Sequence, residues 1–212
     1  MHGRSLSVRL SLPSRRRMLA AFAALGTLAL PLRSRAAARV TPAMTEGPFY
    51  PERFAAQPTP SLLRGPAEGV ERLALAGTVA DEAGTPLAGA RVEIWQCDGF
   101  GRYHHSRDSR PEDRDPSFAG YGWVLTDARG GYAFETIRPV PYPGRTPHVH
   151  LAVIVAGRRR LVTQVFVDGD PGNAGDFLYR RMPEAARERV TMRLAPVRRN
   201  AYEGRFDVVL AG

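Results

Sequence analysis

The chain of 212 residues contains no lysine and a single cysteine, Cys97. One cysteine excludes an internal disulfide, and it also excludes a structural zinc site of the cysteine-rich kind. Because arginine supplies all 30 basic residues, we treat the missing lysine as compositional bias without functional weight. No apolar run reaches the length of about 20 residues that a comfortable membrane span requires. The chain is nevertheless long enough for one domain with a substantial core.

The formal net charge of +9 is concentrated at the N-terminus. The first 38 residues hold seven of the 30 arginines and no acidic residue, which leaves 23 basic against 21 acidic residues in the rest. The body of the chain is therefore close to neutral and lacks the basic footprint of a nucleic-acid-binding protein. We expect no nucleic-acid partner.

Residues 1–38 have the layout of a secretory signal peptide. Three arginines, Arg15–Arg17, precede a mostly apolar stretch of 15 residues, Met18–Leu32, and the small-residue run Ala36–Ala38 follows. Arginines directly before the apolar stretch are typical of twin-arginine export, which carries folded proteins. We therefore expect a periplasmic or extracellular protein with no stable membrane span after signal removal. An uncleaved membrane anchor is the alternative.

Residues 39–72 indicate an extended arm, rich in proline and polar residues, with one compact motif, TEGPFYP. Strand-like stretches follow within residues 73–212: LALAGTVAD, ARVEIWQCD, YGWVLTD, GYAFETI, HVHLAVIVA, RLVTQVFVD and RFDVVLAG. Short alternating strands with frequent turns predict an all-β fold, an antiparallel β-sandwich. PEAARERV, Pro183–Val190, has proline in its first turn and early acids, so we expect one short helix there.

The stretch GRTPHVHLAV contains two of the five histidines, His148 and His150. Residues i and i+2 of a strand project from the same face, so both imidazoles can contact one metal ion. The pair alone is a modest signal, because surface histidines on strands are common. Neighbouring stretches strengthen it: PVPYPGR presents Tyr142 and Arg145, and WQCDGFGRYHH delivers Tyr103.

Two imidazoles and two phenols form an unusual set of candidate ligands. Phenolate is a hard anionic donor that prefers a trivalent ion, and imidazole suits first-row metals generally. A free phenol, with a pKa of about 10, is protonated at neutral pH, so binding both phenols as phenolates requires a strongly Lewis-acidic centre. Ferric iron meets that requirement better than zinc or copper.

These stretches together resemble the intradiol ring-cleavage dioxygenases, the catechol and protocatechuate 3,4-dioxygenase family. The resemblance covers Leu73 to Leu210 and is carried by VEIWQCDGFGRYHH, TDARGGYAFETIRPVPYP, GRTPHVHLAV, LVTQVFVDGDP and RFDVVLAG, with TEGPFYP as an upstream piece. It implies one non-haem Fe(III) per chain. It also implies cleavage of a catechol-type ring by O2 between the two hydroxylated carbons, which yields a cis,cis-muconate-type diacid.

The resemblance assigns roles to individual residues. It implies four protein ligands of the iron, Tyr103, Tyr142, His148 and His150. The implied catalytic residues are Tyr142, which gives way to the catechol and takes a proton, Arg145, which stabilises negative charge on the reacting ring, and Gln164. The implied substrate-binding residues are Gly47, Pro48, Trp95 and Arg145.

Several points stay open at this level. Only five residues, PGRTP, separate Tyr142 from His148, where better-known family members carry a longer loop that helps to shape the substrate pocket. The sequence therefore does not select among catechol, a hydroxylated catechol, protocatechuate and a lignin-derived diol as the substrate. The stretch GTVADEAGTPLAGARVEIW also resembles binding modules of the transthyretin type. A relative that binds catechol or iron without turnover is a further alternative. Family members associate through N-terminal segments, and we expect a homodimer.

Overall fold

The computed structural model describes residues 40–65, 69–109 and 111–212, so the expected signal peptide, residues 1–38, lies outside the described residues. All the described residues belong to one compact unit. Within the described ranges, no helix has the length and apolar character needed to cross a membrane.

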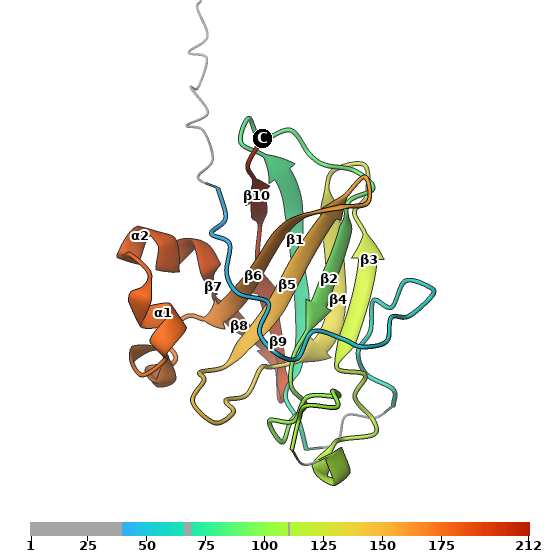
Figure 1. The fold of residues 1–212 in the computed structure, drawn as a ribbon, viewed down its shortest axis with the longest axis vertical. Coiled ribbons are helices and arrows are strands. Elements are labelled where there is room, and N and C mark those ends of the chain that lie inside the picture. Colours follow the sequence, from blue (N-terminus) through green and yellow to red (C-terminus); the bar gives the residue numbers. More distant parts are fainter. Residues whose placement is uncertain (1–39, 66–68, 110) are drawn as a thin grey trace, which may run out of the picture. The chain divides into compact units, whose positions relative to one another are not determined.

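Two five-stranded sheets form a β-sandwich (Figure 1). The first sheet contains β1 (Arg72–Asp81), β4 (Gly131–Ile137), β8 (Leu194–Arg198), β9 (Ala201–Arg205) and β10 (Val208–Leu210). The second sheet contains β2 (Arg91–Trp95), β3 (Tyr121–Leu125), β5 (His148–Val155), β6 (Arg158–Val167) and β7 (Thr191–Met192). The predicted β-sandwich is confirmed.

Most paired strands are antiparallel, as expected, but three pairs are parallel. β1 runs parallel to β9 along its first half and to β10 along its second half, and β7 runs parallel to β6. The sequence signals did not predict β7, β8 or β9. β8 is an edge strand with Pro196 in its middle and mostly exposed side chains, and β7 has only two residues, so neither shows an apolar alternation.

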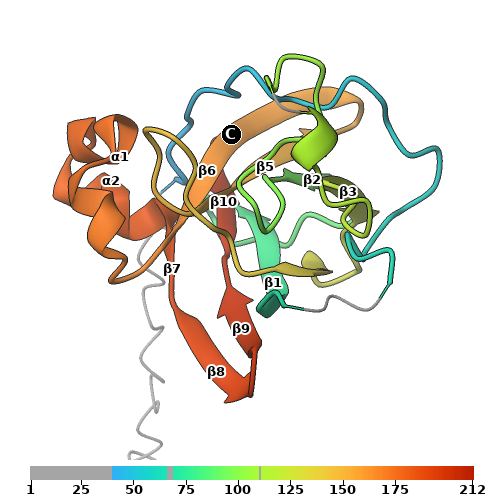
Figure 2. The same ribbon diagram turned by 90° about the horizontal axis from the view of Figure 1, so that it is seen from below.

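The helical segments differ from the single expected helix. α2 (Glu184–Arg187) continues into a 3-10 turn, Glu188–Val190, within the predicted range, but α1 (Phe177–Arg181) was not expected. Five residues are too few for a periodic pattern. Two further 3-10 turns span Pro111–Asp113 and Pro171–Ala174. Figure 2 shows α1 and α2 on the β7 side of the second sheet, away from β3.

Strand β5 is buried on both of its faces. Val149, Leu151 and Val153 point into the main core between the sheets, while His148 and His150 alternate with them and point to the outer face. A second cluster, formed by Trp95, Cys97, Tyr103, Tyr121, Trp123 and Ala152, covers that outer face together with residues of the arm.

The arm is held against β6 by hydrogen bonds to its backbone. The N–H of Met44 donates to the carbonyl of Val162 on β6 at 2.8 Å, and the hydroxyl of Thr163 donates to the carbonyl of Pro42 at 2.8 Å. Figure 1 shows this segment crossing β6 and β5. The predicted extended arm therefore forms one wall of the face that carries both histidines.

Candidate active site

The side chains of His148 and His150 meet at their outer ring nitrogens. The two Nε2 atoms lie 3.2 Å apart, and the two residues are only 1% and 2% exposed. Nδ1 of His148 lies 2.7 Å from the carbonyl of Thr146, which assigns the proton to Nδ1 and leaves the Nε2 lone pair free. Burial, followed by the charge of Arg145, lowers the pKa of His148 to about 4. The imidazole is therefore neutral at neutral pH, the state in which it binds metals.

Two tyrosines lie next to the two histidines, so that each of the four side-chain rings contacts two of the others. Ring centroids lie 4.8 Å apart for His148 and His150, 6.1 Å for His150 and Tyr103, 5.4 Å for Tyr103 and Tyr142, and 5.5 Å for Tyr142 and His148. The hydroxyl of Tyr103 is buried and has no hydrogen-bond partner among the described residues. Burial, and then the neighbouring phenol of Tyr142, raise the pKa of Tyr103. A buried hydroxyl without a partner costs free energy. Binding of the Tyr103 oxygen to a metal ion would remove that cost.

The residues present fit the ferric ion that the family resemblance implies. Within the described residues no group of three or more His, Cys, Asp or Glu side chains is arranged to hold a metal, so a metal at the histidine pair needs the phenols. Two neutral imidazoles with two phenols suit a strongly Lewis-acidic ion, which would convert the phenols to phenolates. The structure brings together the four predicted ligands, Tyr103, Tyr142, His148 and His150, and their binding of iron stays a prediction.

A tight turn places Arg145 beside Tyr142. Its N–H donates to the carbonyl of Tyr142 at 2.9 Å, with Pro143 second in the turn and Gly144 third at a φ of 80°. Proline followed by a left-handed glycine is the signature of a type II turn. The Arg145 guanidinium donates to the hydroxyl of Tyr142 at 3.2 Å. The short loop PGRTP is therefore sufficient to bring two of the three predicted catalytic residues, Tyr142 and Arg145, together.

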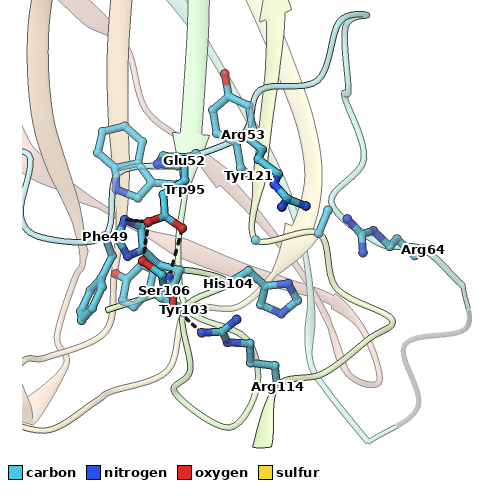
Figure 3. A pocket seen from close by; sticks show the side chains of 14 residues that line it. Phe49, Glu52, Arg53, Arg64, Trp95, Tyr103, His104, Ser106, Arg114 and Tyr121 are labelled. Carbon is cyan, nitrogen blue, oxygen red and sulfur yellow. Dashed lines mark hydrogen bonds and ion pairs between the residues drawn. The ribbon is translucent and has the colours of Figure 1, made fainter. Parts of the chain in front are cut away.

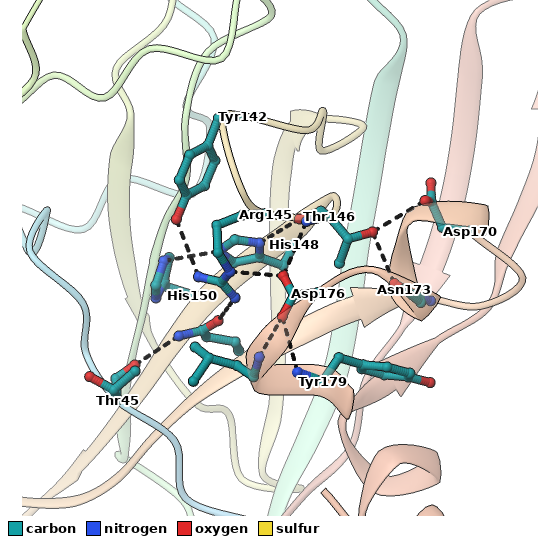
Figure 4. Close-up of polar contacts among 12 residues, drawn as sticks. Thr45, Tyr142, Arg145, Thr146, His148, His150, Asp170, Asn173, Asp176 and Tyr179 are labelled. Atoms are coloured by element: carbon teal, nitrogen blue, oxygen red, sulfur yellow. Dashed lines mark hydrogen bonds and ion pairs between the residues drawn. The ribbon is translucent and has the colours of Figure 1, made fainter. Parts of the chain in front are cut away.

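Besides Tyr142, two side chains fix the guanidinium of Arg145 (Figure 4). Its Nε donates to Asp176 at 2.8 Å, and its Nη2 donates to the side-chain carbonyl of Gln164. Gln164 in turn donates to the carbonyl of Thr45 on the arm at 2.9 Å. Burial opposes ionisation of Asp176 most strongly, but hydrogen bonds from the Tyr179 N–H and from Arg145 outweigh it and lower the pKa of Asp176. Asp176 was not among the predicted site residues.

Trp95 and Gly47 lie against His150, in accordance with their prediction near the site. Trp95 pairs with His150 across β2 and β5, and the rings stack with centroids 4.9 Å apart and an angle of 13°. A Cβ on Gly47 would lie 3.4 Å from Cε1 of His150. Pro48 is exposed on the arm. Phe49, which was not predicted individually, stacks on Tyr103 at 4.6 Å and 20°.

A buried carboxylate organises the loop that carries Tyr103. Asp98 accepts hydrogen bonds from the backbone N–H groups of Phe100, Arg102 and Asp115 at 2.8–2.9 Å. The N–H of Tyr103 donates to Asp108 at 2.8 Å. Both aspartates lie in the predicted motif region, but no sequence pattern separates such a loop anchor from a surface acid.

Comparison with known proteins places the chain in a family. A family model described as dioxygenase matches residues 45–212. The chain belongs to the intradiol ring-cleavage dioxygenases. Membership in this family decides against the alternative of a transthyretin-type binding module.

Two curated relatives of the dioxygenase illustrate the match. The protocatechuate 3,4-dioxygenase beta chain of Burkholderia cepacia is 40% identical over 154 residues, which cover 67% of this chain and 65% of the relative. A hydroxyquinol 1,2-dioxygenase of Corynebacterium glutamicum is 33% identical over 158 residues, which cover 66% of this chain and 50% of the relative. The chain thus spans between half and two thirds of the length of these relatives.

Solved structures confirm the fold of the dioxygenase. The dioxygenase domain of a dioxygenase and carbohydrate-binding fusion from Streptomyces sp. SirexAA-E has a TM-score of 0.67 and 31% identity, covering 82% of this chain and 99% of that one. Catechol 1,2-dioxygenase from Acinetobacter sp. ADP1, inhibited by bound mercury, has a TM-score of 0.62 and 30% identity, covering 81% and 62%.

Proposed function

We propose that the protein cleaves a catechol-type ring between its two hydroxylated carbons, with O2 and one ferric ion, to give a cis,cis-muconate-type diacid. One catechol and one O2 supply every atom of the diacid, so no external reductant is needed. The observation that carries the proposal is the 3.2 Å approach of the Nε2 atoms of His148 and His150 beside the unpartnered, buried hydroxyl of Tyr103.

Tyr103, Tyr142, His148 and His150 would hold the ferric ion, whose Lewis acidity would activate a bound catechol toward O2. The protein has to accept the protons that the catechol loses. Tyr142 is the more exposed of the two phenols, and Arg145 donates to its hydroxyl oxygen. We therefore assign proton acceptance to Tyr142 Oη.

Arg145 supplies the electrostatic part of the reaction. Its guanidinium is held by Asp176 and Gln164, so the positive charge needs no rearrangement when negative charge develops on the substrate ring. Trp95 and Phe49 stack on His150 and Tyr103, and their rings limit the access of water to the ligand set.

The proposal also covers the cellular location and the oligomeric state of the protein. We propose export through residues 1–38 and a homodimer that contacts through the arm. Cell fractionation with and without residues 1–38, and sedimentation of the mature protein with and without the arm, test these two points. A mature protein in the cytoplasm would contradict export, and a monomer that retains the arm would contradict the dimer.

The deciding experiment is the visible spectrum of the iron-loaded protein before and after addition of catechol in air. Phenolate bound to ferric iron absorbs visible light, so we expect colour, a shift with catechol, and later the ultraviolet absorbance of a muconate. If the colour shifts but no product forms from catechol, hydroxylated catechol, protocatechuate or lignin-derived diols, the protein is a relative that binds catechols without turnover. A protein that stays colourless after iron loading would overturn the ligand set.

A further inference from the structure

The imidazole of His150 lacks the hydrogen bond that fixes the imidazole of His148. Nδ1 of His148 lies 2.7 Å from the carbonyl of Thr146, whereas Nδ1 of His150 is buried and has no hydrogen-bond partner among the described residues. A histidine that binds a metal ordinarily donates from its second ring nitrogen, because that hydrogen bond fixes the plane of the ring. Rotation about the last side-chain bond of histidine is otherwise only weakly restricted. Another contact must therefore orient His150.

Trp95 provides a flat surface for His150. The two residues lie directly opposite each other on β2 and β5, and their rings stack with the centroids 4.9 Å apart and an angle of 13° between the planes. The two side chains are only 1% and 2% exposed, so the imidazole cannot turn toward solvent. The plane of the indole therefore determines the plane of the imidazole.

The indole of Trp95 is held in turn by Tyr50 of the arm. The two rings meet edge to face, with the centroids 5.0 Å apart and an angle of 81° between the planes. The Tyr50 hydroxyl donates to Oε2 of Glu93 at 2.6 Å. Glu93 lies two residues before Trp95 on β2, so both side chains are on the same face of the sheet. Burial, and then Glu93, raise the pKa of Tyr50 to about 12, so the hydroxyl keeps its proton at neutral pH.

The carboxylate of Glu93 is fixed independently of Tyr50. Glu93 is 3% exposed, and its Oε1 accepts hydrogen bonds from Nε of Arg91 at 2.7 Å and from the hydroxyl of Tyr121 at 3.1 Å. Arg91 supplies the opposite charge that a buried carboxylate needs. Glu93 is therefore a fixed point on β2 to which Tyr50 is bonded.

The part of the arm around Tyr50 is also bonded to the loop that carries Tyr103. Glu52 accepts hydrogen bonds from the N–H of Ser106 at 3.1 Å and from the hydroxyl of the same residue (Figure 3). Phe49, which precedes Tyr50, stacks on the ring of Tyr103. These contacts on both sides of Tyr50 keep this part of the arm beside the ligand set.

We propose that Trp95 positions the imidazole of His150 for the metal ion. Tyr50 holds Trp95 in place, and Glu93 holds Tyr50. These three positioning residues act on the reaction through the orientation of His150. The proposal rests on the proposed function in one respect, namely that His150 binds the iron. The orientation of the ring is itself measurable in the metal-free protein.

Trp95→Leu removes the flat surface against His150, and Trp95→Phe keeps a smaller one. We expect Trp95→Leu to bind ferric iron about tenfold to hundredfold more weakly than the wild type, the usual cost of removing a residue that orients a metal ligand. Trp95→Phe should recover most of the lost affinity. Competition with nitrilotriacetate, followed through the visible absorbance of the iron-loaded protein, measures the affinity.

The matched control is Trp123→Leu. Trp123 is the second of the two tryptophans, belongs to the same outer cluster as Trp95, and donates from Nε1 to the carbonyl of Ala55 on the arm at 2.8 Å. Its loss should lower the free energy of unfolding, measured with urea, but leave the iron affinity within about twofold of the wild type. Equal losses of iron affinity in Trp95→Leu and Trp123→Leu, or no loss in Trp95→Leu, would overturn the proposal.

A second pair of variants tests the hydrogen bond between Tyr50 and Glu93. Tyr50→Phe and Tyr121→Phe each remove one hydroxyl that donates to this carboxylate. The Tyr50 ring contacts Trp95, and the Tyr121 ring contacts Phe54. Tyr50→Phe should therefore weaken iron binding about tenfold, and Tyr121→Phe should leave it unchanged. Equal iron affinities in the two variants would contradict the role of Tyr50 and Glu93.

Crystal structures of the metal-free variants separate this proposal from the proposed function. In Trp95→Leu the imidazole of His150 should turn away from His148, whereas Trp123→Leu should keep the Nε2 atoms 3.2 Å apart. An unchanged His150 ring in Trp95→Leu would overturn the positioning role even in a protein that binds iron and cleaves catechol. A wild type that binds no iron would contradict the proposed function, and the metal-free structures would still decide the positioning role. Tyr50→Phe serves for the same measurement should Trp95→Leu not fold.

Discussion

Asp176 and Arg145 form a buried ion pair at the edge of the candidate metal centre. Nε of Arg145 lies 2.8 Å from Oδ2 of Asp176, and the two side chains are 9% and 0% exposed. The other carboxylate oxygen accepts hydrogen bonds from the N–H groups of Leu178 and Tyr179 at the start of α1. The N-terminus of α1 therefore determines where the guanidinium beside Tyr142 lies.

Asp176→Asn should impair ring cleavage without removing any group that touches the substrate. The amide oxygen can still cap α1, but Arg145 loses its charged partner and its fixed position. We expect kcat/KM for the catechol substrate to fall by about tenfold to a hundredfold and the free energy of unfolding to fall by about 1.5–3 kcal/mol. Steady-state kinetics and urea unfolding measure the two effects.

Asp170→Asn is the matched control for this pair. Asp170 caps the neighbouring 3-10 turn and accepts a hydrogen bond from the hydroxyl of Thr146, but it does not bond to Arg145. Its substitution should leave kcat/KM within about twofold, the scatter expected for a substitution away from the site. Equal losses in both variants would show that general disturbance of the loop, and not the ion pair, is responsible.

Asp98→Asn should destabilise the protein in a pH-dependent manner. Burial opposes ionisation of Asp98 most strongly, but the neighbouring imidazole of His104, 3.8 Å away, and hydrogen bonds from the N–H groups of Asp115 and Arg102 outweigh it, so the pKa of Asp98 is lowered. A lowered native pKa means that the carboxylate stabilises the fold fully above its unfolded pKa of about 4, and that this contribution is lost as the pH falls through the native value.

The expected loss in the Asp98→Asn variant is about 1–3 kcal/mol at neutral pH, because the amide NH2 would face the N–H of Asp115. The difference from the wild type should shrink as the pH falls below the unfolded pKa of about 4. Urea unfolding of both proteins at several pH values measures it. A difference that is independent of pH would rule out the charge of Asp98 as the cause.

Tyr103→Phe should separate the metal centre from the fold. The substitution removes a buried hydroxyl that has no hydrogen-bond partner among the described residues, so the metal-free variant should be at least as stable as the wild type. Loss of one phenolate should reduce the visible absorbance of the iron-loaded protein and abolish measurable turnover. Thermal unfolding of the metal-free protein and the visible spectrum are the two measurements.

Tyr132→Phe is the opposite case, because the hydroxyl of Tyr132 is buried and donates to the carbonyl of Phe206 at 2.5 Å in the main core. That variant should lose about 1 kcal/mol of stability and keep its colour. A Tyr103→Phe variant that behaves in the same way would contradict the ligand role of Tyr103.

Gly47→Ala should disturb the contact between the arm and His150. Gly47 has a φ of 74°, a left-handed conformation that costs an alanine about 1 kcal/mol, and the added Cβ would lie 3.4 Å from the His150 ring. Gly89→Ala carries the same strain at a φ of 70° with no atom within 4 Å of the added Cβ. Both variants should lose similar stability, and only Gly47→Ala should raise KM several-fold. Equal KM values would remove Gly47 from the site.

Local sequence patterns were sufficient to predict much of the fold and the shared face of the two histidines. The alternation in β5 placed His148 and His150 on one face, because the period of two is a property of the strand alone. Likewise, proline and glycine between Tyr142 and Arg145 specify a turn whose geometry brings the two ends together. Both results depend on residues close together in the chain.

Tertiary structure decided the features that depend on distant segments. No pattern around Asp176 shows that it bonds to Arg145, and none around Phe49 shows that it stacks on Tyr103, because each contact joins segments more than 30 residues apart. The parallel pairing of β1 with β9 and β10 has the same origin. The sequence by itself determined which side chains share a strand face or a turn. Only packing of the arm and of α1 against the second sheet determined which of them are buried, paired and held in place, since burial and pairing arise from long-range contacts.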